Sequence, residues 1–225
     1  MKVKFGAIVV DGRGKLGGHV FAKNRGGNYM RTKVTPVNPQ TARQTAVRSL
    51  FGAIASAWSS LTQTQRDSFG GLVEAYSSTN IFGDIKSPSA IALHQKLNFN
   101  LGNSGQAQIT TALAPIAVPN SAVTDAEYEV GSTAFFVNYA GDTTGSKVLI
   151  FATTSLSQGT KFVKDKLRQI GVVDGSASGD YDAYALYNAK FGVPAIGANI
   201  YVGVKTVNGQ GQASPLEVVK ISVIA

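Results

Sequence analysis

Few residue types in this chain are suited to catalysis. Its only histidines are His19, in a glycine-rich segment, and His94, in a segment with helical periodicity. A serine–histidine triad or a zinc site needs partner residues at defined spacing, and no motif places an acidic residue near either histidine. The absence of cysteine excludes disulfides, thiol nucleophiles and cysteine-ligated metals. The sequence therefore predicts a protein that is not an enzyme, with no catalytic residues, no metal ligands and no cofactor.

A glycine-rich stretch near the N-terminus invites comparison with a phosphate-binding loop. Residues 12–18 read G-R-G-K-L-G-G. A phosphate-binding loop has the pattern G-x-x-x-x-G-K-[ST] and leads into a helix whose first amides bind the phosphate. Because both the pattern and the helix are missing, this stretch is interpreted as a turn region. The single R-G-G triplet at residues 25–27 does not by itself predict nucleic-acid binding.

The positive charge of the chain is concentrated at its N-terminal end. The formal net charge is +8, but residues 1–50 hold ten Lys or Arg against Asp11 alone, whereas residues 51–225 hold eleven against twelve acidic residues. Such asymmetry indicates a segment that contacts nucleic acid or an acidic protein surface. The residues predicted to make this contact are the cations and the aromatic residues among them: Lys2, Lys4, Phe5, Arg13, Lys15, Phe21, Lys23, Arg25, Tyr29, Arg31 and Lys33.

Residues 1–36 lack the hydrophobic periodicity that would build a core. His19–Lys23 and Asn28–Val34 flank Asn24–Gly27, an arrangement typical of a hairpin with a glycine-containing loop. The segment buries too little apolar surface to offset its own ordering entropy. We therefore expect an extended basic arm that becomes ordered on its own domain or on a neighbouring chain.

Residues 37–104 show helical periodicity instead. Apolar residues recur at three- and four-residue steps from Val47 to Leu61, which predicts an amphipathic helix. Asn38 is a suitable N-cap for this helix, and Pro39 suits its first position.

Two further helices are predicted in the same region. Thr62 followed by Gln65 forms a capping box, which begins the second helix. Ser87-Pro88 opens the third helix, and Gly102 is expected to end it. The three helices are predicted to bury their apolar faces against one another.

Beyond residue 104 the hydrophobic period changes from that of a helix to that of a strand. Clusters of Gly, Asp, Ser and Asn separate the candidate strands, which are 109–118, 127–138, 147–153, 167–173, 182–187, 199–207 and 216–224. Short strands with frequent turn signals favour an antiparallel sandwich.

The last strands carry a resemblance to a known domain. Residues 201–215 read Y-V-G-V-K-T-V-N-G-Q-G-Q-A-S-P and resemble the end of a fibronectin type III domain, although the early tryptophan of that domain is missing. The predicted fold class is therefore α+β in two domains: a small three-helix N-terminal domain with an extended basic arm, then an antiparallel immunoglobulin-like β-sandwich. The predicted boundaries are 1–36 for the arm or hairpin, 37–104 for the helical domain and 105–225 for the sandwich.

A second resemblance lies in the N-terminal half. Residues 35–41 read T-P-V-N-P-Q-T, and residues 58–66 read W-S-S-L-T-Q-T-Q-R, followed by Phe69. This order of elements resembles a T-P-x-N-P-x-T and W-x-x-L-T-x-x-Q-R motif of uncharacterised bacteriophage and prophage structural proteins. The resemblance implies a virion or prophage setting rather than a particular molecular role.

These observations lead to three functional hypotheses. The first is a bacteriophage virion structural protein associated with the capsid, as a decoration (cement) or head–neck component. Its arm would bind neighbouring capsid or connector subunits in a homo-oligomer or another symmetric assembly. The alternative is a phage DNA-binding protein whose arm contacts phosphates. A carbohydrate-binding or adhesion module built on the sandwich ranks third, because the chain lacks an export signal.

The sequence also predicts that membranes are not a partner. No apolar run approaches the ~20 residues that span a bilayer. The apolar run after the basic start ends at Asp11 and has no small-residue cleavage site, so no signal peptide is expected. We therefore expect a chain that is made in the host cytoplasm and resides in the virion.

Overall fold

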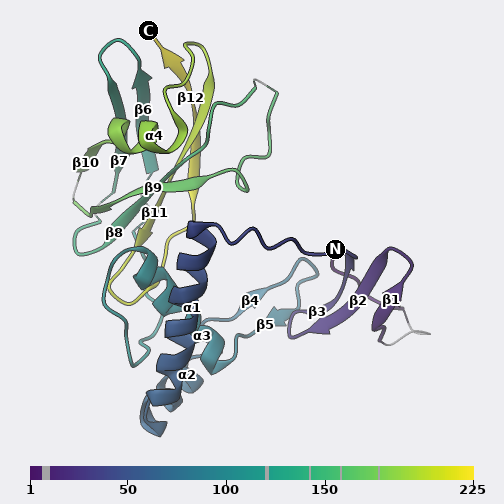
Figure 1. Cartoon of the computed structure of the whole chain (residues 1–225). Coiled ribbons are helices and arrows are strands. Elements are labelled where there is room, and N and C mark those ends of the chain that lie inside the picture. The colour runs from purple at the N-terminus through teal and green to yellow at the C-terminus, as the bar shows by residue number, and fades with distance from the viewer. Residues whose placement is uncertain (7–10, 120–121, 142, 158, 177) are drawn as a thin grey trace. The chain divides into compact units, whose positions relative to one another are not determined.

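The chain folds into two compact units (Figure 1). A computed structural model describes residues 1–6, 11–119, 122–141, 143–157, 159–176 and 178–225. The first unit comprises residues 1–96 and 110–115, and the second comprises residues 97–109 and 116–225. The division falls inside helix α3 (Ala90–Asn103). The domain boundaries predicted after residues 36 and 104 stay predictions.

The first unit begins with a small antiparallel sheet, called here the N-terminal sheet. Its strands are β1 (Gly14–Leu16), β2 (His19–Asn24) and β3 (Gly27–Thr32), paired in that order. The strands β2 and β3 form the predicted hairpin, with Asn24 opposite Gly27. The predicted extended arm is wrong, because these residues pair their backbone groups with one another.

Two capping boxes start the helices α1 (Ala42–Ser60) and α2 (Gln63–Gly71). The Thr62 hydroxyl accepts a hydrogen bond from the Gln65 amide at 3.3 Å, and the Gln65 side chain accepts one from the Thr62 amide at 2.9 Å. This second capping box confirms the prediction. Asn38 is not the N-cap of α1: that position belongs to Thr41, preceded by Gln40 at a positive φ of 48°.

The core of the first unit is a small aromatic cluster. The Trp58 ring centroid lies 5.3 Å from that of His94 and 5.9 Å from that of Phe69, and Ile54 of α1 is fully buried. The predicted apolar stripe of α1 is only partly covered, since Phe51 is 48% exposed. A short hairpin joins α2 to α3, and its strands β4 (Ser78–Thr79) and β5 (Ile85–Lys86) have two residues each.

The second unit is built on one continuous seven-stranded sheet. Its strand order is β10-β7-β6-β12-β11-β8-β9. The pair β6–β12 is parallel and the other pairs are antiparallel. The strands are β6 (Ala122–Glu129), β7 (Ala134–Ala140), β8 (Lys147–Ala152), β9 (Arg168–Asp174), β10 (Ser178–Asp182), β11 (Asn199–Val207) and β12 (Glu217–Ile224).

This sheet curls back on itself around its core. A Cβ atom at Gly171 of β9 would lie 2.8 Å from the Tyr181 hydroxyl of β10, so the two end strands approach closely. A fourth helix, α4 (Tyr184–Phe191), packs on the sheet and supplies the buried Tyr187. The Tyr187 hydroxyl donates to the Thr153 carbonyl at 3.0 Å, and burial raises its pKa. The core therefore combines aliphatic with aromatic side chains, and a backbone carbonyl satisfies the buried Tyr187 hydroxyl.

The predicted fold class is wrong. The seven strands form one mixed, nearly closed sheet joined through the parallel pair β6–β12, instead of an antiparallel immunoglobulin-like sandwich. The helices are four and are spread along the described chain, and the second half of α3 belongs to the sheet unit, so no separate three-helix domain exists.

Three predicted strands also differ from the observed elements. The stretch 127–138 is two strands, because Thr133 at φ 54° turns the chain between them. The stretch 182–187 contains the start of α4, whose alternating apolar residues imitate a strand. Residues 109–118 form no strand, because side chains occupy their backbone groups: Asn98 bonds both the amide (2.7 Å) and the carbonyl (3.1 Å) of Ile109. The other four predicted strands are confirmed.

Candidate interaction surface

The N-terminal sheet sorts its residues onto two unlike faces. Residues directly opposite each other in antiparallel strands share a face. Lys15 lies opposite Val20, and Val20 lies opposite Arg31, so these three residues form one row across β1, β2 and β3. We call it the cationic row. With strands about 4.8 Å apart, its two charges start about 10 Å apart at the backbone.

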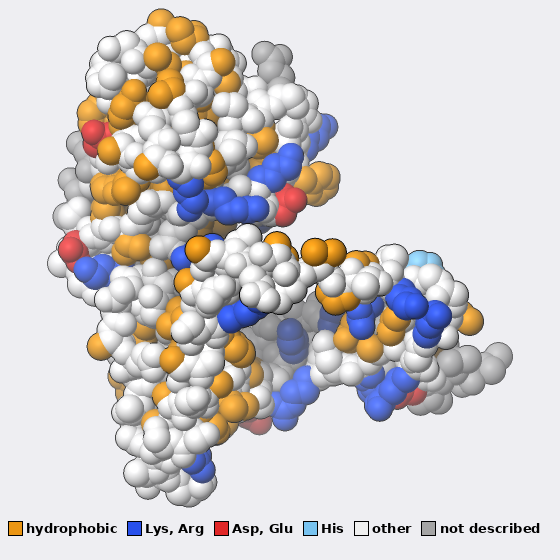
Figure 2. Space-filling view, in the orientation of Figure 1, with side chains coloured by type: hydrophobic (Ala, Val, Ile, Leu, Met, Phe, Trp, Pro, Cys, Tyr) orange, Lys and Arg blue, Asp and Glu red, His pale blue; other side chains and the backbone are white. Residues whose placement is uncertain are grey.

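A second row on the same face adds an aromatic ring. Ala22 lies opposite Tyr29, and Tyr29 is bridged in turn to Lys2. Lys33 follows two residues after Arg31, and its amide bonds the Gly18 carbonyl at 2.8 Å, which continues the ladder. This face therefore combines cations with Val20 and Tyr29. Figure 2 shows Lys and Arg side chains over the N-terminal sheet as well as over other parts of the visible surface.

The opposite face carries a pair of apolar residues that is partly covered from within the first unit. Phe21 lies opposite Met30, and its ring lies 6.3 Å from that of Phe5. Lys23 shares this face and lies 3.5 Å from the Asp11 carboxylate, which also pairs with Arg13 at 3.5 Å. The charges of Lys23 and Arg13 are thus partly compensated within the sheet.

The chain start closes the outer edge of β3. The Met1 ammonium donates to the Met30 carbonyl, and the Met30 amide donates back to the Met1 carbonyl, both at 2.8 Å. The Val3 amide donates to the Asn28 carbonyl at 3.0 Å, and the Lys2 ammonium donates to the Gly26 carbonyl. The Lys2 ammonium therefore already has a hydrogen-bond partner within the N-terminal sheet.

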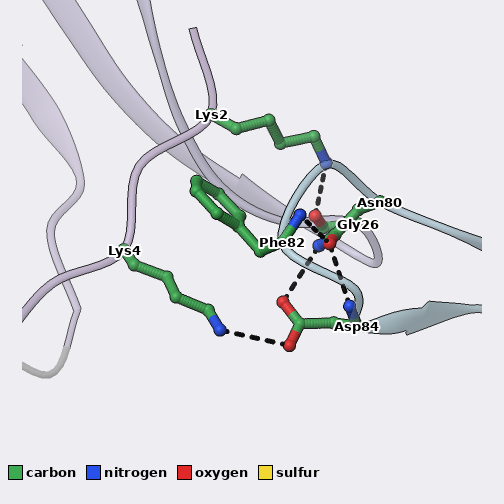
Figure 3. Close-up of polar contacts among 6 residues, drawn as sticks. All are labelled: Lys2, Lys4, Gly26, Asn80, Phe82 and Asp84. Atoms are coloured by element: carbon green, nitrogen blue, oxygen red, sulfur yellow. Dashed lines mark hydrogen bonds and ion pairs between the residues drawn. The ribbon is translucent and has the colours of Figure 1, made fainter.

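Lys4 anchors the sheet to the loop between β4 and β5 (Figure 3). Its ammonium lies 3.3 Å from the Asp84 carboxylate and 5.5 Å from the centre of the Phe82 ring. Asn80 holds the loop, because its side-chain oxygen accepts from the amides of Phe82 (2.8 Å) and Asp84 (3.0 Å). The hydrogen bond from Asn80 and then that from Lys4 lower the pKa of Asp84. A cavity of about 300 Å³ lies beside this anchor.

Apart from Tyr29, which lies on the cationic face, the predicted contact residues fall into two groups. Lys2, Lys4, Arg13 and Lys23 have partners inside the first unit, and Phe5 and Phe21 contact each other. Among the residues that the structure describes, no ion pair involves Lys15, Arg25, Arg31 or Lys33. The cations available to a partner are therefore fewer than the sequence predicted, and two of them belong to the cationic row.

A charged surface of opposite sign lies on the second unit, and sequence reasoning missed it. Glu127 of β6 lies opposite Phe136 of β7, which lies opposite Asp182 of β10. We call these three residues the acidic row. Phe136 is 46% exposed, and Asp125 continues the acidic stripe along β6. The alternation of acidic residues at 125, 127 and 129 was the available signal.

The two histidines lie in different environments, one buried and one exposed. His94 is 1% exposed and packs against Trp58 and Phe69, and its burial lowers its pKa. His19 is exposed and lies opposite Leu16 and Thr32. Across the described ranges, no three His, Asp or Glu residues are grouped so that they could hold a metal ion. No helix in the described part of the chain is long and apolar enough to cross a membrane.

The W-x-x-L-T-x-x-Q-R motif forms the corner between α1 and α2. Thr62 and Gln65 supply the capping box, and Arg66 donates to the carbonyls of Ser59 (2.8 Å) and Trp58 (3.3 Å) at the end of α1. The Arg66 guanidinium also lies 6.0 Å from the Trp58 ring centre. The motif residues therefore shape a helix corner. No protein-family model matches the chain, and no curated protein matches it either.

Proposed function

We propose that the chain is a bacteriophage virion structural protein, associated with the capsid as a decoration or head–neck component. In this proposal it binds neighbouring subunits through the cationic face of the N-terminal sheet. The observation that carries the proposal is the lack of a core under that sheet: among the described residues of 1–50, Gly26 alone is buried.

A sheet without a hydrophobic core gains little favourable free energy when it folds without a partner. Fixing each residue's backbone costs about 1–2 kcal/mol in entropy, and burial of apolar side chains normally offsets this cost. Here Leu16 is 69% exposed and Val34 is 66% exposed. A partner that covers Val20 and Tyr29 and neutralises Lys15 and Arg31 on the cationic face supplies part of the missing stabilisation. A structural protein in a particle always has such neighbours, and the motif of residues 35–66 resembles proteins of that setting.

DNA is the second candidate partner, and Tyr29 is the observation that favours it. The ring shares a face with Lys15 and Arg31, and an aromatic ring among cations suits base stacking combined with phosphate contact. A fluorescence titration with single- and double-stranded DNA at several salt concentrations separates the candidates. Affinity that falls steeply with salt supports DNA binding. No measurable binding at about 50 mM salt would rule out the DNA candidate.

Rebinding to particles tests the virion proposal. Phage particles made without this chain are mixed with the purified chain and pelleted. The wild-type chain should pellet with the particles, and a Lys15→Glu, Arg31→Glu variant should remain in the supernatant. Lys161→Glu, Lys164→Glu is the matched control, because it makes the same charge change at exposed residues of the second unit. Pelleting of both variants alike would contradict the role of the cationic face.

A further inference from the structure

The two charged rows of this chain have matching designs. Each row crosses three neighbouring strands and places an apolar residue between two like charges: Lys15, Val20 and Arg31 in the N-terminal sheet, and Glu127, Phe136 and Asp182 in the second unit. Since strand spacing is about 4.8 Å in every sheet, the outer charges of both rows start about 10 Å apart. The two rows are therefore complementary in charge and equal in spacing.

The match continues along the strands. Residues two apart on one strand face the same side about 7 Å from each other. Lys33 follows Arg31 at this spacing on the cationic face, and Asp125 precedes Glu127 at this spacing on the acidic face. A face-to-face approach of the two sheets would pair several cations with carboxylates and bring Val20 and Tyr29 against Phe136.

The charges on both sides are available. Lys15 and Arg31 are exposed, as are Asp125 and Glu127. Within the described ranges, no ion pair involves any of these four residues. The Asp182 Oδ1 accepts a hydrogen bond from the Tyr184 amide at 2.9 Å. Phe136 is 46% exposed at the centre of the acidic row, which leaves an apolar contact uncovered.

We propose that the cationic face of the N-terminal sheet docks onto the β6–β7–β10 face of a second copy of this chain. The inference rests on the proposed function, and it names the neighbouring subunit as another copy. Because the cationic face and the β6–β7–β10 face are different surfaces, the contact is head-to-tail. Its repetition gives a ring or an open filament.

A single contact of this kind is small. Three strands of at most six residues cover roughly 14 by 20 Å, well below the about 800 Å² per partner of a standard stable complex. The isolated chain should therefore associate weakly, and the contact should become firm only where many copies repeat it. Because the contact is charged, it should also weaken as salt rises.

Sedimentation velocity on the full chain tests the inference. The wild-type chain at increasing concentration in 50 mM NaCl should form dimers and larger species, which return to monomers in 500 mM NaCl. A Lys15→Glu, Arg31→Glu variant and an Asp125→Lys, Glu127→Lys variant should each stay monomeric. Asp182 is left intact because it bonds the first amide of α4. Lys161→Glu, Lys164→Glu is the control and should associate like the wild type.

Mixing the two variants gives the decisive result. One variant carries two acidic faces and the other two cationic faces, so the equimolar mixture should recover the association that each has lost alone. Glutamine substitutions at the same four positions provide a second set that avoids charge reversal, and they should also abolish association. A wild-type chain that stays monomeric, or a mixture that fails to associate, would overturn the inference. If particle rebinding still succeeds in that case, the proposed function stands and the neighbour is a different protein.

Discussion

A close backbone approach at a left-handed glycine in the second unit predicts a severe effect from one added methyl group. Gly211 has a φ of 75°, and a Cβ atom there would lie 2.2 Å from the Leu97 carbonyl oxygen of α3. The loop cannot move away freely, because the Asn100 side chain donates to the Gly211 carbonyl at 2.8 Å. Leu97 is itself 1% exposed, so the helix cannot retreat without disturbing buried side chains.

The expected cost of Gly211→Ala has two parts. A left-handed conformation costs a non-glycine residue about 1–2 kcal/mol, and forcing a methyl group into a filled space costs about 1–3 kcal/mol. The sum of about 2–5 kcal/mol is a large fraction of the stability of a typical domain. We therefore expect the melting temperature of the second unit to fall by roughly 10–20 °C.

Differential scanning calorimetry of the full chain measures this change, and two optical signals assign it. Trp58 is the only tryptophan and belongs to the first unit, so its fluorescence reports that unit. Most tyrosines belong to the second unit and give a near-ultraviolet circular dichroism signal for it. Gly209→Ala is the matched control, since its nearest neighbour beyond the adjoining residues is 3.9 Å away. Equal melting of Gly211→Ala and the wild type, or equal damage from Gly209→Ala, would refute the reasoning.

Three further predictions concern the first unit. Because burial lowers the pKa of His94, this histidine takes up a proton at higher pH in the unfolded chain than in the folded chain. The free energy of unfolding, measured in urea by Trp58 fluorescence, should therefore fall as the pH drops below about 6.5. The fall should be smaller in His94→Gln. Thr62→Ala should cost about 1 kcal/mol in the same assay by removing the cap of α2, whereas the exposed Thr64→Ala should cost less than about 0.5 kcal/mol. Asp84→Asn should speed tryptic cleavage after Lys4, because the ion pair is lost; unchanged cleavage would mean that this pair does not hold the N-terminus.

Features set by neighbouring residues were predictable from the sequence. The capping box of Thr62 and Gln65 and the hairpin of β2 and β3 depend on residues a few positions apart. The strands at 147–153, 167–173, 199–207 and 216–224 follow from alternation alone. Each of these elements satisfies its local pattern whatever the rest of the chain does.

Features set by distant partners were not predictable. Residues 182–187 are predicted to form a strand, but the buried site of Tyr187 and its bond to Thr153 favour the helix α4. Residues 109–118 look apolar enough for a strand, yet Asn98 takes the backbone groups of Ile109. Nothing local reveals these side-chain partners.

The sequence predicted where the positive charge is concentrated, but not which charged residues share a face. The concentration of cations in the first 50 residues is a property of composition. Which cations are free depends on strand register, since register places Lys15 and Arg31 in one row and turns Lys23 to the other face. The acidic row likewise needs the pairing of β6 with β7 and of β7 with β10.

The composition of purified phage particles tests the central claim most directly. Particles are collected from the phage or induced lysogen that encodes the chain, washed in high and low salt, and analysed by quantitative mass spectrometry. The proposal predicts that the chain is retained in intact particles at a fixed ratio to the major coat protein. A chain that is abundant in the lysate but missing from intact particles would contradict it.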